Sequence, residues 1–230
     1  MTVVDVADAV TDAADPFRRR LLDGLAESIA ERGYRDTTIA DIVRHARTSK
    51  RTFYQEFDSK KECFVELVRT AIADMIVQIK AAVDPEAFWQ NQIRQAIGAY
   101  VDVIEAKPAV TLSWIRELPA LGEAVHSVQR HNTDKLAQML TDITSNPGFR
   151  RAGLPSAPVQ LSVILLGGLR ELTALTVEDN KDVRGIVDAA VAASIALVSA
   201  DARSKTGPAD ARSKTGPADA RSKTGPADAR

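Results

Sequence analysis

Side chains able to carry out covalent or metal chemistry are few in this 230-residue sequence, and their spacing does not bring them together. Cys63 is the one cysteine, and within a predicted helix we expect it to pack rather than to act as a redox switch. His126 and His131 lie five residues apart, which argues against a shared metal site on one helix face. No nucleophile–base pair, paired-carboxylate motif or glycine-rich phosphate loop is present. The sequence therefore predicts a protein that is not an enzyme and that holds no metal and no cofactor.

Hydrogen-bonding and cationic side chains are instead concentrated within residues 37–62. At about 100° per residue, a helix beginning at Lys50 would place Phe53 and Phe57 on one face. The opposite face would carry Arg51 and Gln55, which offer donors, an acceptor and one positive charge. A helix of about nine residues is roughly 13 Å long, and a DNA major groove about 12 Å wide admits one. The pattern predicts a recognition helix that is anchored through its phenylalanines.

Capping residues indicate how this helix is positioned. Thr38 followed by Asp41 is a capping-box pattern, and an apolar stripe with helical spacing accompanies it, formed by Ile39, Ile42, Val43 and Ala46. A turn over Arg47 and Thr48 comes next, and Ser49 is the expected N-cap of the recognition helix. Two helices joined by a tight turn predict a helix-turn-helix motif.

This segment resembles the DNA-binding domain of the tetracycline-repressor (TetR) family, whose usual run is close to T-x-x-x-I-A-x-x-A-G-V-S-x-x-T-x-Y-x-x-F-x-x-K. The matching residues are Thr38, Ile42, Val43, Ala46, Ser49, Thr52, Phe53, Tyr54, Phe57 and Lys60. The sequence departs at the turn, where Arg47 and Thr48 replace the family's usual glycine and aliphatic residue. If that turn requires a positive φ at residue 47, arginine is a strained choice there. The resemblance covers residues 15–62 and implies double-stranded DNA as a partner.

Roles in DNA binding follow from residue type and position. Phosphate contacts are expected from Thr38, Ser49, Lys50, Thr52, Tyr54 and Lys60. Arg51 is expected to read base edges, because arginine to guanine is the commonest specific pairing. Gln55, Thr48 or Arg47 would assist it, although Arg47 could instead contact a phosphate.

Charge supports this interpretation locally but not globally. The whole chain has a net charge of −1, which gives no sign of nucleic-acid binding. Between residues 44 and 61, however, only Glu56 and Asp58 oppose the cations Arg44, Arg47, Lys50, Arg51, Lys60 and Lys61. Such a run could be an ordinary solvated face, but around a helix-turn-helix it favours phosphate binding. Because no signal peptide or apolar run of 18 residues appears, we expect a cytoplasmic protein without a membrane segment.

The head that carries the motif is predicted to span residues 15–62. Residues 1–14 are acidic and poor in large side chains, so they are expected to fray. Asp15 and Pro16 supply an N-cap and a first helical position, and Gly33 is the expected end of that helix. This helix and the two of the motif form a three-helix head.

Helical patterning continues through a second domain, residues 63–200, with no alternating strand pattern. A long helix from Lys60 to about Val83 would connect the head to this domain. Proline and glycine punctuation then predicts helices over 86–106, 109–118, 120–143, 156–178 and 182–200. The expected fold is all-α, with about nine helices: a helix-turn-helix head followed by a helical effector-binding and dimerisation domain.

Two late helices predict an interface between copies of the chain. The helix at 156–178 is apolar nearly all round, so it must be covered on two sides. With the helix at 182–200 it could pack on a second copy, and Gly167-Gly168 would allow close approach. The alternative is an internal core position for both helices. Because a two-fold dimer doubles the DNA site, we expect a homodimer on a palindromic operator.

The middle helices are expected to enclose a small-molecule effector. The side chains expected to contact it are Phe88, Trp89, Tyr100, Trp114, Arg116, His126 and Met139. The alternative for most of these side chains is an ordinary place in the core. An apolar or aromatic effector would suit such a lining, and the TetR resemblance implies that the helix beginning at Lys60 couples effector binding to the separation of two heads.

Residues 201–230 repeat the unit Ala-Asp-Ala-Arg-Ser-Lys-Thr-Gly-Pro and lack large apolar side chains, so they are expected to be disordered. They have either no role or the role of a weakly basic arm on DNA. The predicted function is a sequence-specific transcriptional regulator, a repressor that an effector releases from DNA. The alternative is an architectural DNA-binding protein, which would bind unrelated DNA nearly as well as any operator.

Overall fold

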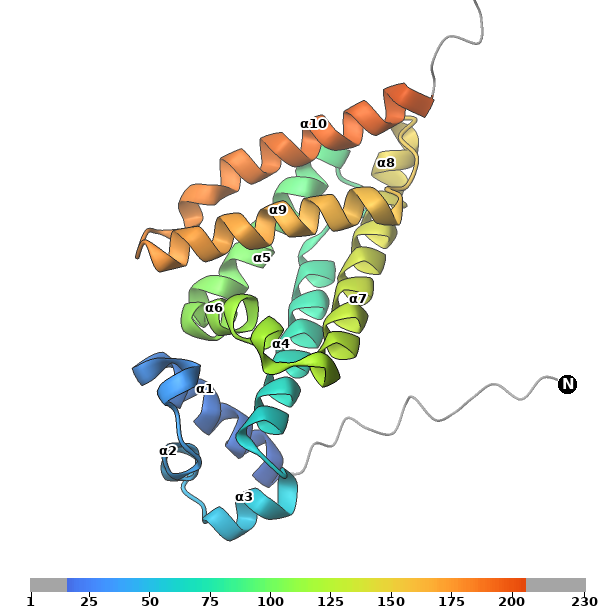
Figure 1. Ribbon diagram of the computed structural model, residues 1–230. Coiled ribbons are helices and arrows are strands. Elements are labelled where there is room, and N and C mark those ends of the chain that lie inside the picture. Colours follow the sequence, from blue (N-terminus) through green and yellow to red (C-terminus); the bar gives the residue numbers. More distant parts are fainter. Residues whose placement is uncertain (1–15, 206–230) are drawn as a thin grey trace, which may run out of the picture.

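The computed structural model describes residues 16–205, and in that range the chain forms ten α-helices and no strand (Figure 1). The prediction of an all-α fold is confirmed. The helices are α1 (Pro16–Asp36), α2 (Ile39–His45), α3 (Lys50–Glu56), α4 (Lys60–Ala82), α5 (Trp89–Ala106), α6 (Pro108–Arg116), α7 (His126–Thr144), α8 (Pro147–Arg151), α9 (Val159–Glu178) and α10 (Val187–Lys205).

Helices α1, α2 and α3 form a small head at one end of the molecule, and α4 leads out of it (Figure 1). Phe53 of α3 and Phe57 just after it have no more than 1% of their surface exposed. Tyr34 stacks on Phe64 with ring centroids 4.2 Å apart, which joins the end of α1 to the first turn of α4. Burying aromatic surface from all these segments is what holds a head of this size together.

The remaining helices form the body, in which α4 packs against α5 and α7. Helix α9 packs across α6 and α7, and α10 packs along α5. Both α9 and α10 lie at the end of the molecule opposite the head (Figure 1). The body also touches the head directly, because α1 packs against α6.

Several helix boundaries differ from the predictions. The helix expected over 120–143 begins only at His126, after two short 3₁₀ turns over Leu118–Leu121 and Glu123–Val125. Pro119 lies in the first turn, and Gly122 between the two turns has φ 94, which an α-helix does not allow. Helix α8 was not predicted, because its first two residues, Pro147 and Gly148, belong to a turn-like Asn-Pro-Gly sequence.

Helix α10 ends at Lys205, five residues into the stretch expected to be disordered. Its last turns use the first repeat unit, whose Asp-Ala-Arg-Ser-Lys is compatible with a helix until the following Gly-Pro. The predictions for residues 1–14 and for the later repeats concern residues outside the described range.

Two helical segments, Val159–Glu178 and Val183–Ser204, are long and apolar enough to cross a membrane by length and composition alone. Only 22% and 28% of these two segments are buried, so much of their apolar surface faces outward. One side of α9 packs against α6 and α7 of the body, so only the other side is uncovered. The uncovered side suits another protein chain as well as it suits lipid.

Candidate DNA-binding surface and effector cleft

Helix α2 lies unusually close to α1, and Gly24 makes this possible. A Cβ atom at residue 24 would lie 2.6 Å from the carbonyl oxygen of Ile42 and 2.9 Å from the amide nitrogen of Ala46. Both are backbone atoms of the helix-turn-helix, so they could not move aside without moving α2. The glycine therefore sets the distance between α1 and the motif.

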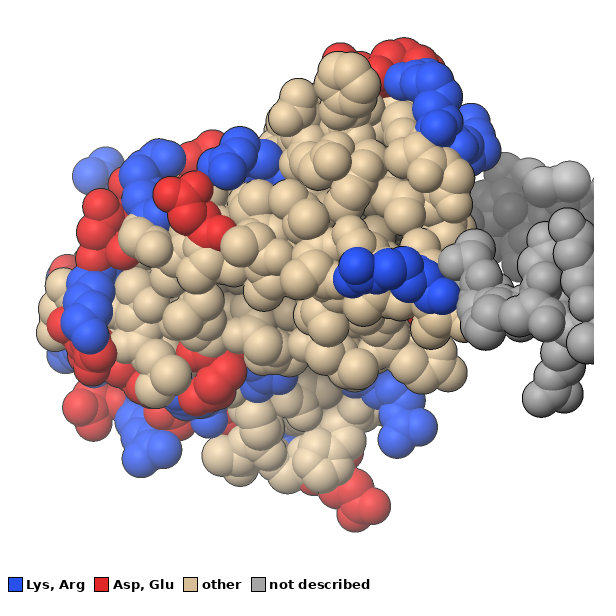
Figure 2. Space-filling view, turned by 90° about the horizontal axis from the view of Figure 1, so that it is seen from above, with Lys and Arg blue, Asp and Glu red and all other residues tan. Residues whose placement is uncertain are grey.

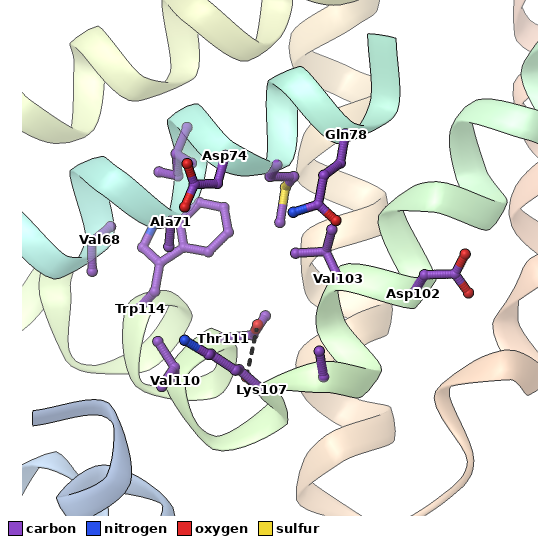
Figure 3. A pocket seen from close by; sticks show the side chains of 13 residues that line it. Val68, Ala71, Asp74, Gln78, Asp102, Val103, Lys107, Val110, Thr111 and Trp114 are labelled. Carbon is purple, nitrogen blue, oxygen red and sulfur yellow. Dashed lines mark hydrogen bonds between the residues drawn. The ribbon is translucent and has the colours of Figure 1, made fainter. Parts of the chain in front are cut away.

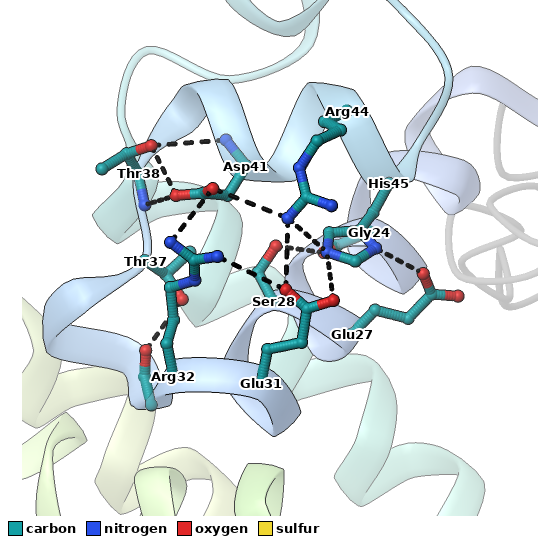
Figure 4. A network of polar contacts seen from close by, with 11 residues as sticks. Gly24, Glu27, Ser28, Glu31, Arg32, Thr37, Thr38, Asp41, Arg44 and His45 are labelled. Carbon is teal, nitrogen blue, oxygen red and sulfur yellow. Dashed lines mark hydrogen bonds and ion pairs between the residues drawn. The ribbon is translucent and has the colours of Figure 1, made fainter.

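A polar network fixes the same pair of helices from the solvent side (Figure 4). The two ring nitrogens of His45 lie 2.9 Å from a carboxylate oxygen of Glu27 and 3.2 Å from one of Glu31. Arg44 donates to the second oxygen of Glu31 at 3.1 Å, and Arg32 lies 3.3 Å from Asp41. This network was not predicted, although Glu27 and Glu31 are four residues apart, a spacing that places them on one face of α1.

The predicted capping box at the start of α2 is confirmed. The backbone N–H of Thr38 donates to the Asp41 carboxylate at 3.0 Å, and the Asp41 N–H donates to the Thr38 hydroxyl oxygen at 3.3 Å. The Thr38 hydroxyl also donates to Asp41 at 2.7 Å. These hydrogen bonds from Thr38 stabilise the carboxylate and lower the pKa of Asp41.

The turn between α2 and α3 does require a positive φ at residue 47, the case in which the sequence predicted strain. Arg47 has φ 51, in the left-handed region that favours glycine. The turn is closed by the N–H of Thr48, which donates to the carbonyl of Val43 at 2.9 Å. Arginine is therefore strained at this position, and the strained backbone holds its side chain exposed at the edge of the motif.

Helix α3 presents the outer face that the sequence predicted. Ser49 caps it by accepting a hydrogen bond from the N–H of Thr52 at 3.1 Å. Arg51 and Gln55 are exposed, and Tyr54 has 57% of its surface exposed while its ring edge packs on buried Phe53. A polar and cationic surface held on an apolar base can enter a groove of DNA without unfolding.

The cations at this surface differ in how they are engaged. Arg47, Lys50 and Arg51 form no ion pair with any residue in the described range. Arg44, by contrast, is paired with Glu31, and Arg18 donates to the backbone carbonyl of Glu56 at 3.0 Å. Unpaired cations can meet phosphate or bases without first breaking a protein contact.

Lys60 corrects one predicted phosphate contact. Its ammonium group donates to the carbonyl oxygens of Tyr34 at 2.9 Å, Arg35 at 3.1 Å and Thr37 at 2.7 Å. An ammonium group has three N–H donors, so these contacts satisfy it fully. Partial burial lowers the pKa of Lys60. Lys60 thus closes the C-terminal end of α1, where unpaired carbonyl groups would otherwise remain.

An ion pair joins the head to the end of α6 at the C-terminal end of α1. The Arg35 Nε donates to the Glu117 carboxylate at 2.8 Å. Glu117 directly follows α6, and α6 packs on α1. The head is therefore connected to the body twice, covalently through α4 and by contact through α6.

A cleft of about 170 Å³ lies between α4, α5 and α6 (Figure 3). Its apolar lining is Val68, Ala71, Ile72, Met75, Val103, Ala106, Val110 and the ring of Trp114. Its polar lining is Asp74, Gln78, Asp102, Lys107 and Thr111. Of the residues predicted to bind an effector, only Trp114 lines this cleft. A sequence signal was available, because Asp74 and Gln78 interrupt the apolar pattern of α4 one turn apart.

The other side chains predicted to contact an effector are dispersed. Phe88 is 79% exposed, and Trp89 packs on Phe149 with centroids 6.0 Å apart. The Tyr100 hydroxyl is buried against Thr173 at 2.9 Å, and burial raises its pKa to about 12. Met139 is a core residue with 3% exposure.

Arg116 and His126 complete the set, and each lies apart from the cleft. Arg116 donates to Glu171 at 2.9 Å and to Glu178 at 2.6 Å, which ties α6 to α9. Its hydrogen bonds lower the pKa values of both glutamates. His126 lies in a separate, open depression with Arg130, His131 and Asp134. No group of three or more His, Cys, Asp or Glu side chains between residues 16 and 205 has the arrangement of a metal site.

Residues 21–67 match the family model for bacterial regulatory proteins of the tetR family. The chain is 28% identical over 91 residues to the HTH-type transcriptional activator FasR of Mycolicibacterium smegmatis, a match that covers 40% of this chain and 42% of FasR. It is 25% identical over 85 residues to the uncharacterised HTH-type transcriptional regulator YhgD of Bacillus subtilis, covering 37% of this chain and 44% of YhgD. The match thus spans less than half the length of either relative.

Solved structures share the fold over most of the chain. The transcriptional regulator FadR of Bacillus subtilis, in complex with stearoyl-CoA, superposes with a TM-score of 0.66 at 17% identity, over 79% of this chain and 97% of FadR. A tetR-family transcriptional regulator from Streptomyces coelicolor superposes with a TM-score of 0.68 at 14% identity, over 84% and 86% of the two chains.

The head of this chain is similar to the helix-turn-helix DNA-binding domain of bacterial regulatory proteins of the tetR family, and the solved structures share its fold over the remaining helices.

Proposed function

We propose that this protein is a homodimeric, sequence-specific repressor that binds a palindromic operator in the cytoplasm and is released by a small-molecule effector. The observation that carries the proposal is the outer face of α3. Arg51 and Gln55 are exposed there, and Arg51 pairs with no carboxylate in the described range. The helix is held from behind by Phe53 and Phe57, so its outer face can read base edges in the major groove.

The uncovered side of α9 supports a homodimer. Figure 2 looks onto the end of the molecule formed by α9 and α10, which is largely free of charged side chains, with charges gathered at its rim. Exposed apolar side chains on these two helices are Val159, Val163, Ile164, Leu172, Leu175 and Leu197. A surface with many exposed apolar side chains and few charges is typical of an interface between protein chains.

Two glycines in α9 support the same arrangement. A Cβ atom at Gly167 or Gly168 would meet nothing within 4 Å, so the described chain itself gives no steric reason for either glycine. Glycine inside a helix costs about 0.5–1 kcal/mol relative to alanine. The close approach of a helix from a second copy would account for both residues.

The effector response is proposed to act through the double attachment of the head. Helix α4 enters the body from the head, and Glu117 at the end of α6 holds Arg35 of α1. A ligand that changes the separation of α4 and α6 would change the angle of the head. In a dimer this would alter the spacing of the two recognition helices relative to two half-sites.

The direct test is footprinting of the purified chain on the DNA upstream of its own gene, at near-physiological salt with non-specific competitor. We expect protection of a roughly palindromic site, because each protomer presents one α3. Protection without sequence preference would reject the proposal in favour of an architectural protein, since a regulator discriminates by about 10³-fold or more.

The sign of regulation needs a second readout, because the relative FasR is named an activator. A reporter gene placed behind the protected site should be expressed less when the protein is present. Higher expression would replace repression by activation and leave the DNA-binding assignment intact.

A further inference from the structure

The cleft between α4, α5 and α6 limits the size of any ligand. An enclosed cavity of roughly 150 Å³ holds one benzene molecule, and the cleft has about 170 Å³. This volume suits a single ring with a short side chain. Its lining includes Met75, Val103 and Trp114. Thioether and aromatic groups make favourable contacts with a planar ring.

The Asp74 carboxylate on the α4 wall favours a ligand that carries a positive charge. In Figure 3 the Asp74 carboxylate extends from α4 toward the Trp114 ring, which comes from α6 on the other side. Asp74 forms no ion pair with any residue between 16 and 205. An exposed carboxylate and an indole that line the same cleft both attract positive charge.

The other charged residues of the cleft do not cancel this preference. Asp102 is turned away from the cavity (Figure 3) and is held by Arg184 at 2.9 Å. Lys107 lies on the opposite rim, between α5 and α6, and its side chain extends along the α6 wall (Figure 3). Its ammonium group lies across the cleft from Asp74, near Val110 and Trp114 (Figure 3), where it partly opposes the binding of a cation.

We propose that the cleft binds a small aromatic amine, with its ring on Met75, Val103 and Trp114 and its ammonium group at Asp74. This proposal names the effector class of the regulator and rests on the function proposed above. Because α4 and α6 form opposite walls, a ligand in the cleft contacts both helices that hold the head. The ammonium group of the ligand contacts Asp74 of α4, and its ring contacts Trp114 of α6.

Binding can be measured without DNA. The chain has two tryptophans, so in the Trp89→Phe background all indole fluorescence comes from Trp114. The probes are 2-phenylethylamine, its neutral isostere 2-phenylethanol and its anionic counterpart 3-phenylpropionate, each titrated against the full chain and checked by calorimetry. We expect the amine to quench Trp114 and to bind at least about tenfold more tightly than either counterpart.

Charge variants test the assignment to Asp74. Asp74→Asn should remove the preference for the amine, whereas Lys107→Gln should strengthen amine binding severalfold because it removes the opposing charge. Glu105→Gln is the matched control, since it removes a nearby carboxylate that pairs with Arg184 outside the cleft; amine binding should stay within twofold. Equal binding of the three probes, or an unchanged preference in Asp74→Asn, would overturn the proposal.

The link to DNA release is tested separately. Saturating amine should weaken operator binding about tenfold in the Trp89→Phe background and leave it unchanged in Asp74→Asn. Unchanged operator affinity at saturating amine would overturn the effector role. If no operator exists, the regulator proposal fails, but the fluorescence titration still decides whether the cleft selects amines.

Discussion

Arg35 at the end of the DNA-binding head and Glu117 at the end of α6 form an ion pair with Nε and Oε2 2.8 Å apart. They are 82 residues apart in the sequence, and they bridge the head and the body. Their side chains are 77% and 21% exposed, respectively, so water competes strongly for the pair. Its importance is therefore expected to lie in holding the head at one angle more than in global stability.

Glu117→Gln should loosen the head without unfolding the protein. Amides near residues 33–38 should exchange hydrogen faster by mass spectrometry, while the melting temperature should change little. Asp188→Asn, which breaks an exposed ion pair with Arg94 within the body, is the control and should leave these amides unaffected. Equal exchange in both variants would show that the α1–α6 packing alone orients the head.

Gly24→Ala should destabilise the head by about 1–3 kcal/mol, since the added methyl group meets the backbone of α2 at 2.6 Å and cannot be accommodated by a side-chain rotation. Gly98→Ala in α5 is the matched control. Its Cβ meets nothing within 4 Å, so the better helix propensity of alanine should raise stability by up to about 1 kcal/mol. Urea unfolding of both variants measures the difference. A neutral Gly24→Ala would mean that α1 and α2 can separate without cost.

Arg47→Gly should relieve the left-handed backbone strain at φ 51. A non-glycine residue in this region destabilises the fold by about 1–2 kcal/mol. Glycine loses more chain entropy on folding, which offsets about 0.5–1 kcal/mol of the gain. The net expectation is a gain of about 0.5–1 kcal/mol in the free energy of unfolding, measured by urea denaturation. Asn180→Gly, at φ 53, should gain less, because asparagine tolerates this conformation.

The same Arg47 variant also tests a DNA contact. If Arg47 binds a phosphate, the salt dependence of operator binding should fall by about one counterion in Arg47→Gly. An unchanged slope together with lost discrimination between sites would instead place Arg47 at a base edge.

Arg51→Ala should cost about 1–3 kcal/mol of operator binding and relax specificity at the base pair that Arg51 reads. Lys50→Ala, one residue earlier on the same helix, should weaken binding to all sequences evenly. Competition assays with single-base operator variants separate the two outcomes. Full discrimination in Arg51→Ala would move base reading to Gln55 or to the turn.

Cys63 is expected to be unreactive in the folded protein. It is fully buried, and burial raises the pKa of its thiol to about 12, so little thiolate exists near pH 8. A thiol reagent at pH 8 should label it only at the rate of unfolding, and labelling should become fast in urea. Rapid labelling of the native protein would show that the junction of α1 and α4 opens locally.

The sequence alone determined the class of fold and predicted which face of the helix-turn-helix is exposed. Helical periodicity, caps and short apolar stripes are local, so Thr38, Ser49, Phe53 and Phe57 could be assigned from their neighbours along the chain. The sequence could also predict that Arg47 would be strained if the turn required a positive φ, because this requirement depends on the local turn geometry alone. The residue types and their spacing contain no catalytic or metal-binding pattern, and this by itself pointed away from an enzyme.

Only the tertiary structure decided which residues meet across helices. Lys60 was assigned to phosphate because its charge and position match the motif, yet the carbonyls that bind it lie 23 to 26 residues earlier in the sequence. The cleft between α4, α5 and α6 was not foreseen for the same reason: aromatic residues are equally suited to a core and to a pocket, and only packing places Tyr100 in the core and Trp114 at the cleft. The pairing of Arg35 with Glu117, and the exposure of one side of α9, depend on helix crossings that hydrophobic periodicity does not specify.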